Sequence, residues 1–271
     1  MTVAGSIAEF LALKVTENAL VPTMGALHEG HLSLVRAAKD AGLPVVVSIF
    51  VNPMQFGPNE DYSRYPRNLD HDVALLHQAG ADFVFAPTVQ DIYPRTGSKI
   101  MVPEVAERFE GSRRPGHFDG VATIVCKLFQ ITRPQMAIFG LKDLQQCAVI
   151  QRMVEDLNIR VELSFQPTLR EPDGLAMSSR NVYLSPDQRR TAPALFHELS
   201  RTKNLIESGK NVENTLADAR ASLVSQGFEL DYYDLIDRRT FSESRELSPH
   251  SAVITAVKLG TTRLIDNILI F

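Results

Sequence analysis

The feature that most constrains the fold is an alternation of short apolar runs with longer amphipathic runs, which continues through residue 165. Short β-branched runs are typical of strands covered on both faces of a sheet, and amphipathic runs are typical of helices. This alternation predicts an α/β fold, an open parallel sheet with helices on both faces. Strands are predicted at residues 19–21, 44–51, 81–86, 136–139 and 160–165, and helices at 32–42, 70–80, 120–131 and 142–157.

The pattern changes near residue 168. A polar loop over residues 167–181 is followed by helix signals at 186–209 and 211–227 and by strand signals at 231–236, 252–258 and 264–271. Helices followed by strands of antiparallel type predict a smaller C-terminal α+β domain. We therefore expect one domain over residues 1–168 and a second over residues 169–271.

Composition limits the kinds of partner and compartment. The chain is 44% hydrophobic and 22% charged, as in ordinary globular proteins, and its net charge of -4 gives no electrostatic case for nucleic acid. No apolar run reaches the roughly 18 residues of a membrane span, and no signal peptide is recognised. Cys126 and Cys147 lie in helical patterns without CxxC spacing and are expected to be buried, reduced thiols. These features predict a cytoplasmic protein without a membrane partner.

The segment VPTMGALHEGH, from residue 21 to His31, places two histidines three positions apart where a strand leads into a helix. A helix N-terminus offers N–H groups and the positive end of the helix dipole, and Gly25 and Gly30 allow close backbone approach. His28 and His31 can donate hydrogen bonds to phosphate oxygens as charge develops. A hydrolase zinc site needs histidines four positions apart and a third ligand, and neither is evident. The segment predicts a phosphate site, with a structural cap as the alternative.

Two further segments suit phosphate. Gly140-Leu-Lys-Asp143 places a glycine at a strand end and Lys142, a point positive charge, at a helix start. Met177-Ser-Ser-Arg180 adds two hydroxyls and a guanidinium that can clamp polyphosphate. Taken alone, the first is also typical of a solvated helix start and the second of an exposed turn.

Two neutral amides are predicted to contact a small polar substrate. Gln55 follows the strand at 44–51, and Gln146 lies one turn beyond Lys142 on the same helix face. An amide both donates and accepts hydrogen bonds, which suits hydroxyl groups. Because ligands of open α/β sheets bind outside the carboxyl ends of the strands, we expect these groups to line one crevice.

Several specific sequence blocks occur in order along essentially the whole chain. They are Pro22-Thr-Met-Gly25, His28-Glu-Gly-His31, Phe50-Val-Asn-Pro-Met-Gln-Phe56, Tyr65-Pro-Arg67, Arg114-Pro-Gly-His-Phe118, Lys142-Asp143, Gln145-Gln146, Asp173-Gly-Leu-Ala-Met-Ser-Ser-Arg-Asn181 and Arg263-Leu-Ile-Asp-Asn267. With these blocks the chain resembles the pantothenate synthetase family, the ATP-dependent ligases that join pantoate to β-alanine. It departs from the family at Leu141, where the family usually has glutamate.

The resemblance implies a Rossmann-like domain that binds ATP and pantoate, a smaller lid domain, and usually a homodimer. Gln55 and Gln146 correspond to the pantoate contacts, and Gln55 also lies near β-alanine. His31 corresponds to a histidine with a proton-donor or transition-state role. The implied ATP contacts are Met24, Gly25, Ala26, Leu27, His28, Glu29, Gly30, His31, Gly140, Leu141, Lys142, Asp143, Leu169, Met177, Ser178, Ser179 and Arg180.

The expected reaction has two steps, formation of pantoyl adenylate with release of pyrophosphate and then attack by β-alanine with release of AMP. His28, His31, Lys142 and Arg180 are the expected catalytic residues, acting by positioning and charge stabilisation. Mg²⁺ is expected with ATP, and because no protein ligand cluster can be named, it should lie on phosphate oxygens and water. The alternatives are a nucleotidylyltransferase acting on another small substrate and a non-enzymatic ATP-binding sensor.

Overall fold

The computed structural model of the chain describes residues 1–58, 60, 62–95 and 97–270. Within it the chain forms two compact units, of which the first comprises Met1–Leu141 and Val149–Pro167, and the second Lys142–Ala148 and Thr168–Phe271. The segment Lys142–Ala148, which lies inside the first predicted domain by sequence, therefore belongs to the second unit. None of the helices in these described ranges is both long enough and apolar enough to cross a bilayer.

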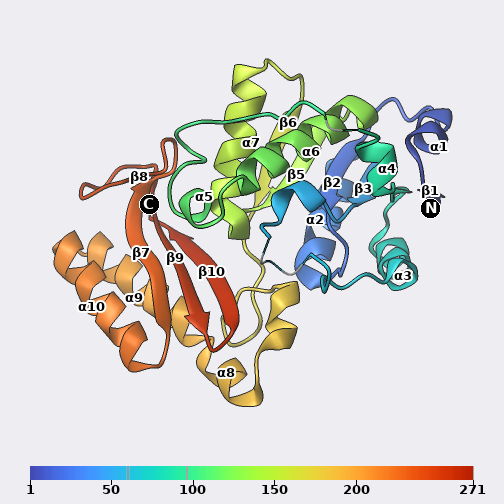
Figure 1. The fold of residues 1–271 in the computed structure, drawn as a ribbon. Helices are drawn as coiled ribbons and strands as arrows, with labels where there is room; N and C mark the ends of the chain where they lie inside the picture. Colours follow the sequence, from blue (N-terminus) through green and yellow to red (C-terminus); the bar gives the residue numbers. More distant parts are fainter. Residues whose placement is uncertain (59, 61, 96, 271) are drawn as a thin grey trace. The chain divides into compact units, whose positions relative to one another are not determined.

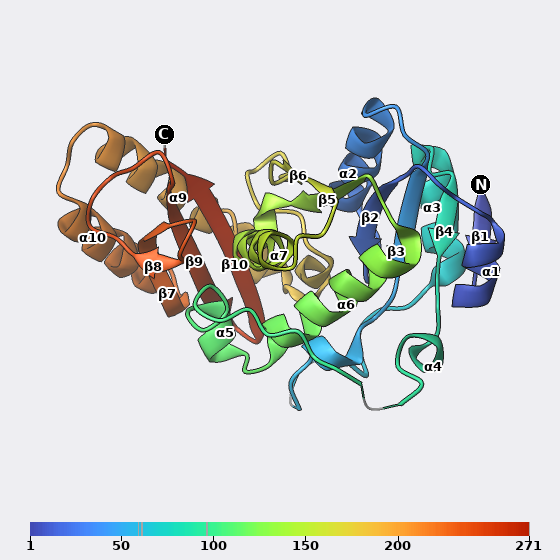
Figure 2. The ribbon, with the colours of Figure 1, turned by 90° about the horizontal axis from the view of Figure 1, so that it is seen from above.

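The first unit is built on a six-stranded parallel sheet in the order β1-β4-β3-β2-β5-β6, which Figure 2 shows from above. The predicted open parallel sheet is confirmed. Its elements, most of which are labelled in Figure 1, are β1 (Thr2–Ala4), α1 (Ile7–Ala12), β2 (Ala19–Thr23), α2 (Glu29–Asp40), β3 (Val45–Ile49), the 3₁₀ turn η1 (Pro53–Gln55), α3 (Leu69–Ala79), β4 (Phe83–Phe85), α4 (Val89–Ile92), α5 (Glu110–Arg113), α6 (His117–Thr132), β5 (Met136–Gly140) and β6 (Glu162–Gln166).

Alternate residues of the strands pack on opposite faces of this sheet, as strand geometry requires. On one face, Val21 and Val47 belong to a buried cluster with Val35 of α2 and Leu76 of α3. On the other face, the Phe85 ring lies 5.1 Å from the ring of Phe10 in α1. Both faces of the central strands are therefore covered, which explains why their sequences are apolar almost throughout.

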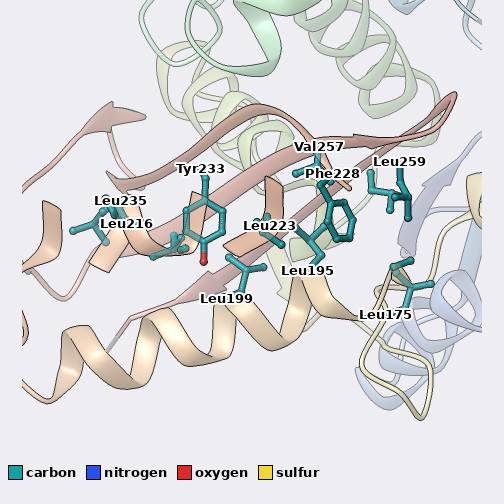
Figure 3. Close-up of a cluster of buried hydrophobic side chains, with 14 of the residues drawn as sticks. Leu175, Leu195, Leu199, Leu216, Leu223, Phe228, Tyr233, Leu235, Val257 and Leu259 are labelled. Carbon is teal, nitrogen blue, oxygen red and sulfur yellow. The ribbon is translucent and has the colours of Figure 1, made fainter. Parts of the chain in front are cut away.

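The second unit contains an antiparallel sheet in the order β10-β9-β7-β8, which confirms the predicted α+β architecture. Figure 3 shows its core, where leucines of α9 and α10 meet Tyr233, Leu235 and Val257 of the sheet. Its elements are η3 (Ser179–Tyr183), α8 (Pro186–Thr191), α9 (Ala194–Glu207), α10 (Val212–Ser225), β7 (Glu229–Asp237), β8 (Ser242–Glu243), β9 (Ser251–Leu259) and β10 (Thr262–Leu269); η2 (Leu141–Asp143) and α7 (Leu144–Asp156) include its Lys142–Ala148 segment.

Several element boundaries differ from the predictions. The helix predicted at 32–42 begins at Glu29, because His28 caps it, and the helix predicted over 186–209 is two helices separated near Pro193. The short elements β1, α1, α4, α5 and β8 were not predicted. The strand predicted over 264–271 is described to Leu269, and Phe271 lies outside the described residues.

Candidate active site

The loop between β2 and α2 carries the predicted phosphate segment, and its backbone is held from within the protein. Gly25 N donates to Thr23 Oγ1 at 3.2 Å. Ala26 N and Leu27 N donate to the two carboxylate oxygens of Asp72, at 3.0 and 2.8 Å. The backbone amides of these three residues, which precede the helix, are therefore used inside the protein.

His28 and His31 cap α2 with their own rings. Nδ1 of His28 accepts from Gly30 N at 3.1 Å, and Nδ1 of His31 accepts from His28 N at 3.4 Å. A ring nitrogen that accepts a hydrogen bond carries no proton, so these partners assign Nε2–H to each neutral imidazole. The ring centroids lie 4.1 Å apart. The capping role that the sequence left open is thus real, and it makes Nε2 the donor atom of both rings.

Gln55 is buried, and Asn52 fixes the orientation of its amide. Two backbone groups orient Asn52, since Oδ1 accepts from Met54 N at 3.2 Å and Nδ2 donates to Gly120 O at 3.0 Å. The same Nδ2 donates to Gln55 Oε1 at 3.2 Å, which leaves Gln55 Nε2, 2.9 Å from Met24 Sδ, as the donor end. Gln55 therefore offers N–H groups suited to the oxygens of a hydroxy acid.

Tyr93 and Gly120 support this arrangement. The Tyr93 hydroxyl donates to Asn52 Oδ1 at 2.9 Å, and burial raises the pKa of Tyr93 to about 12, so the hydroxyl keeps its proton. At Gly120, a Cβ atom would lie 2.4 Å from Met54 O. Only glycine therefore lets α6 approach the turn η1 that carries Gln55.

Behind Gln55, the side chains of Glu60, Arg114 and His117 form a hydrogen-bonded chain. Arg114 makes two 2.7 Å bonds to the Glu60 carboxylate, and its Nη1 lies 3.0 Å from His117 Nε2. His117 Nδ1 donates to Gln55 O at 2.8 Å. Because arginine is only a donor, Nε2 of His117 must accept, so the ring is neutral with its proton on Nδ1. The chain thus ends on the backbone of a predicted substrate contact.

Burial and charge set the protonation of this chain. Burial, reinforced by the neighbouring Arg114 guanidinium, lowers the pKa of His117 to about 4. Burial alone would raise the pKa of the Glu60 carboxyl, but the hydrogen bond and positive charge of Arg114 outweigh it and hold that pKa below its usual range. Near neutral pH, Arg114 and Glu60 therefore form an ion pair, and Arg114 also donates to the neutral imidazole of His117.

In the second unit, Lys142 lies in η2 with its side chain 21% exposed and Nζ 3.8 Å from Asp143 Oδ1. Nδ2 of Asn267, from β10, donates to Lys142 O at 3.1 Å. Gln146 follows in α7 and is half-buried, so the two residues lie close in the chain within one unit. The backbone of the predicted phosphate-binding lysine is thus tied to the last described strand.

Arg170 fixes the part of β10 that carries this tie. Its guanidinium makes 2.6 and 2.9 Å bonds to the buried Asp266 carboxylate, lies 3.7 Å from the centroid of the Phe196 ring, and donates to Asn267 O at 3.3 Å. Paired, bidentate and stacked contacts of this kind hold a guanidinium in one orientation. Asn267 is therefore held by a rigid neighbour.

The loop over residues 169–180 contains further predicted ATP contacts of the second unit, and it folds back on itself. Met177 N donates to Leu169 O at 3.0 Å beside an antiparallel bridge of Arg170 with Ala176. Ser178 then caps η3, its Oγ accepting from Arg180 N at 3.3 Å. The structure thus brings Leu169 next to the Met177–Arg180 segment.

The thiols do not provide a nucleophile. Cys147 is buried as predicted, whereas Cys126 is only half-buried, so that part of the prediction is wrong. Burial raises the pKa of both thiols, which disfavours the reactive thiolate. Within the described residues, no group of three or more histidine, cysteine or acidic side chains could hold a metal ion.

Each unit gathers its own share of the predicted site residues. The first contains the histidine segment, which follows β2, Gln55, which follows β3, and Gly140, the last residue of β5; β3 and β5 both neighbour β2. The second contains Lys142, Gln146, Leu169 and the Met177–Arg180 segment. The sequence reading missed Asp72, Tyr93 and Glu60, and it gave no role to Asn52 or to the Arg114–Phe118 block that the resemblance quoted.

Comparison with known proteins gives matches over nearly the whole chain. The family model described as pantoate-beta-alanine ligase matches residues 4–269. Pantothenate synthetase of Gluconobacter oxydans is 52% identical over 250 residues, which cover 91% of each chain.

Two solved structures extend the comparison. Pantothenate synthetase of Thermus thermophilus superposes with a TM-score of 0.96 at 43% identity, covering 100% of both chains. The pantoate-beta-alanine ligase of Francisella tularensis, solved with beta-gamma ATP and beta-alanine, has a TM-score of 0.83 at 37% identity and covers 99% of this chain and 97% of its own.

Proposed function

Because the chain belongs to the pantoate–β-alanine ligase family, we propose that it condenses pantoate with β-alanine at the expense of ATP, forming the C–N bond of pantothenate. The observation that carries this proposal is the family match over residues 4–269, supported by the Francisella relative solved with beta-gamma ATP and beta-alanine.

In the first step, a pantoate carboxylate oxygen attacks the α-phosphorus of ATP, and the bond to the bridging oxygen of pyrophosphate breaks. The products are pantoyl adenylate and pyrophosphate. A carboxylic acid with a pKa near ~4 is already ionised at neutral pH, so this step needs no base. Catalysis then consists of positioning the reactants and stabilising charge on phosphate oxygens.

His28 and His31 stabilise that charge as Nε2–H donors. The support for this role is the capping geometry, which commits Nδ1 of both rings to backbone amides at 3.1 and 3.4 Å. Neutral donors bind phosphate oxygens without needing a proton from solvent. Met24 to Leu27 and Glu29 to Gly30 complete the nucleotide contacts of this segment.

Gln55 binds pantoate through Nε2, because Asn52 occupies its Oε1. Its donor end suits a hydroxyl or carboxylate oxygen, and the same residue lies near the β-alanine that arrives later. Gln146 is the second pantoate contact, and its neutral amide suits a hydroxyl group.

Further ATP contacts are proposed among residues that follow β5 and among residues of the second unit. Lys142 supplies a positive charge to phosphate, and Arg180 with Ser178 and Ser179 supplies a guanidinium and hydroxyls. Gly140, Leu141, Asp143, Leu169 and Met177 are the other proposed ATP contacts. We assign ATP and pantoate binding to residues 1–168, and the role of a lid to residues 169–271.

In the second step, the β-alanine amine attacks the carbonyl carbon of the adenylate, and AMP leaves as the bond to its phosphate oxygen breaks. The amine loses a proton in this step, to solvent or to the departing phosphate. Water would hydrolyse the adenylate, so exclusion of water matters more here than a protein base.

The described residues do not form a protein cage for Mg²⁺, since no cluster of three or more metal-binding side chains is found among them. We propose that Mg²⁺ enters with ATP, held by phosphate oxygens and water. We also propose a cytoplasmic homodimer, which is the usual state in the family; light scattering of the purified protein tests the dimer.

Isotope exchange tests this function and separates it from its alternatives. Labelled pyrophosphate should enter ATP when pantoate is present and β-alanine is absent, because adenylate formation is reversible on the enzyme. Adding β-alanine should then yield AMP and pantothenate in equal amounts. A nucleotidylyltransferase for another substrate would show no pantoate-dependent exchange, and a sensor would bind ATP without turnover. Formation of ADP instead of AMP would contradict the adenylate mechanism.

A further inference from the structure

The carboxylate of Asp72 has no role in the mechanism above, yet it is buried in direct contact with the nucleotide segment. Its residue is 1% exposed and lies in the first turn of α3, 45 positions from Leu27. No ion pair of Asp72 with a basic side chain is found among the described residues. A buried carboxylate must be compensated by hydrogen bonds, and here the donors are the amides of Ala26 and Leu27.

The hydrogen bonds to Asp72 are made where the backbone adopts an unfavourable conformation. Ala26 has a φ of 51°, a left-handed conformation that residues with a Cβ atom rarely adopt. Gly25, just before it, has a φ of 80°, and a Cβ atom there would lie 2.8 Å from Asp72 Oδ2. The loop therefore closes against the carboxylate and keeps its unfavourable turn through two charge-assisted bonds.

This turn sets the start of α2. The backbone runs from Leu27 directly into His28, the cap residue, and the ring of His31 in turn accepts from His28 N. A shift of the Ala26–Leu27 peptide would move both rings and the hydrogen bonds that fix their tautomers. Small misplacements of catalytic groups are enough to slow a reaction by about 100-fold.

We propose that Asp72 is a positioning residue of the ligase, which holds the backbone of residues 25–27 so that the His28 and His31 imidazoles present Nε2–H to the ATP phosphates. The proposal rests on the function assigned above to the two histidines. A positioning role predicts that loss of the Asp72 carboxylate impairs the reaction. A purely electrostatic role predicts the opposite, because removing a negative charge near a triphosphate should strengthen ATP binding.

The test is Asp72→Asn, which keeps the shape of the side chain but turns one acceptor oxygen into a donor that faces a backbone N–H. We expect kcat to fall about 10–100-fold while the KM for pantoate changes little. In a His31→Ala background the same substitution should add a smaller loss, because only its effect through His28 remains. A near-normal kcat, a lower KM for ATP, or an equal loss in both backgrounds would overturn the proposal.

Asp82→Asn is the matched control. The Asp82 carboxylate also accepts from a backbone amide, Val45 N at 2.8 Å, but at the amino end of β3, and it pairs with Lys39 Nζ at 3.1 Å. The Asp82→Asn variant should lose thermal stability, as Asp72→Asn does, but its kcat should be unchanged. If Asp72→Asn does not fold, Gly25→Ala displaces the loop while keeping the charge, and it should show the same fall in kcat; normal turnover would refute the role.

Nitrogen-15 spectra of labelled histidine give a readout that does not depend on turnover. In the unmodified protein without substrates, His28 and His31 should both show an unprotonated Nδ1, and Asp72→Asn should shift these signals while those of the other histidines remain. Unchanged His28 and His31 signals would refute the positioning role even if activity fell. Should the unmodified chain make no pantothenate, the proposed function fails, and these spectra still decide the role of Asp72.

Discussion

Lowering the pH is expected to destabilise the first unit through His117. The imidazole of this residue is buried as a neutral group that donates a hydrogen bond to the Gln55 carbonyl. Burial and the Arg114 guanidinium beside it lower the pKa of His117 from an ordinary value of 6.5 to about 4. The acidic groups that face the ring, Glu60 and Glu110, act in the opposite direction but do not cancel this shift. The folded protein therefore resists protonation at a site where the unfolded chain accepts it.

The sign and size follow from proton linkage. The imidazole binds a proton more weakly in the folded state, so this contribution to stability is fully present above about pH 6.5 and falls as the pH drops to about 4. A shift of this size corresponds to about 3 kcal/mol over that interval. The lowered pKa of Glu60 also makes stability fall with acid, but mainly below about pH 4.5. The window above that value therefore isolates the imidazole.

Urea denaturation between about pH 7 and about pH 4.5 measures this effect. In His117→Asn, the amide can still donate to Gln55 O but cannot titrate, so the free energy of unfolding should fall less steeply with acid than in the unmodified protein. His77→Asn removes an exposed imidazole from α3 and serves as the control for losing one histidine. If the unmodified protein and His117→Asn lose stability in parallel, or if the folded-state signal of His117 titrates near pH 6.5, the reasoning is refuted.

Four further substitutions test individual contacts. His31→Ala should lower kcat by roughly 10²–10³ with a smaller change in ATP affinity, measured by titration, since it removes one donor to developing charge; near-normal turnover would contradict this role. Lys142→Ala should mainly impair use of ATP and Gln146→Ala use of pantoate, and steady-state kinetics giving equal losses for both substrates would contradict the division. Gly120→Ala should cost about 1–3 kcal/mol in thermal denaturation, because its Cβ would lie 2.4 Å from Met54 O; an unchanged melting temperature would disprove the close packing.

The architecture could be predicted because it depends on local patterns. Residues such as Val45 and Val47 belong to a continuous apolar run, which is what a strand covered on both faces requires. The three-residue strand β1 escaped prediction because Thr2 and Val3 are exposed and too few residues are paired to leave a pattern. The break near Pro193 was overlooked because the helical signal continues on both sides of it.

The candidate site was predictable only in part, for a physical reason. His28, Lys142 and Gln55 follow strands in unusual local contexts, which the sequence displays directly. An aspartate in the first turn of a helix, such as Asp72, is instead expected simply to complement the helix dipole. Its bonds to residues 45 and 46 positions away arise from tertiary packing, and no local signal announces them. The same holds for Tyr93, which reaches Asn52 across 41 positions.

The tie between Asn267 and Lys142 has a consequence for the order in which the protein is made. Asn267 follows Lys142 by 125 positions. At translation rates of about 5–20 residues per second, Asn267 is therefore synthesised on the order of ten seconds after Lys142. Meanwhile β5 and β6, which flank the Lys142–Ala148 segment, can pair as soon as both have left the ribosome. A nascent chain arrested before residue 267 should therefore resist protease across the parallel sheet but be cut near Lys142, and protection at both places would contradict this order. The hydrogen bond that holds the Lys142 backbone is thus completed only after residue 267 has been made, later than β5 can pair with β6.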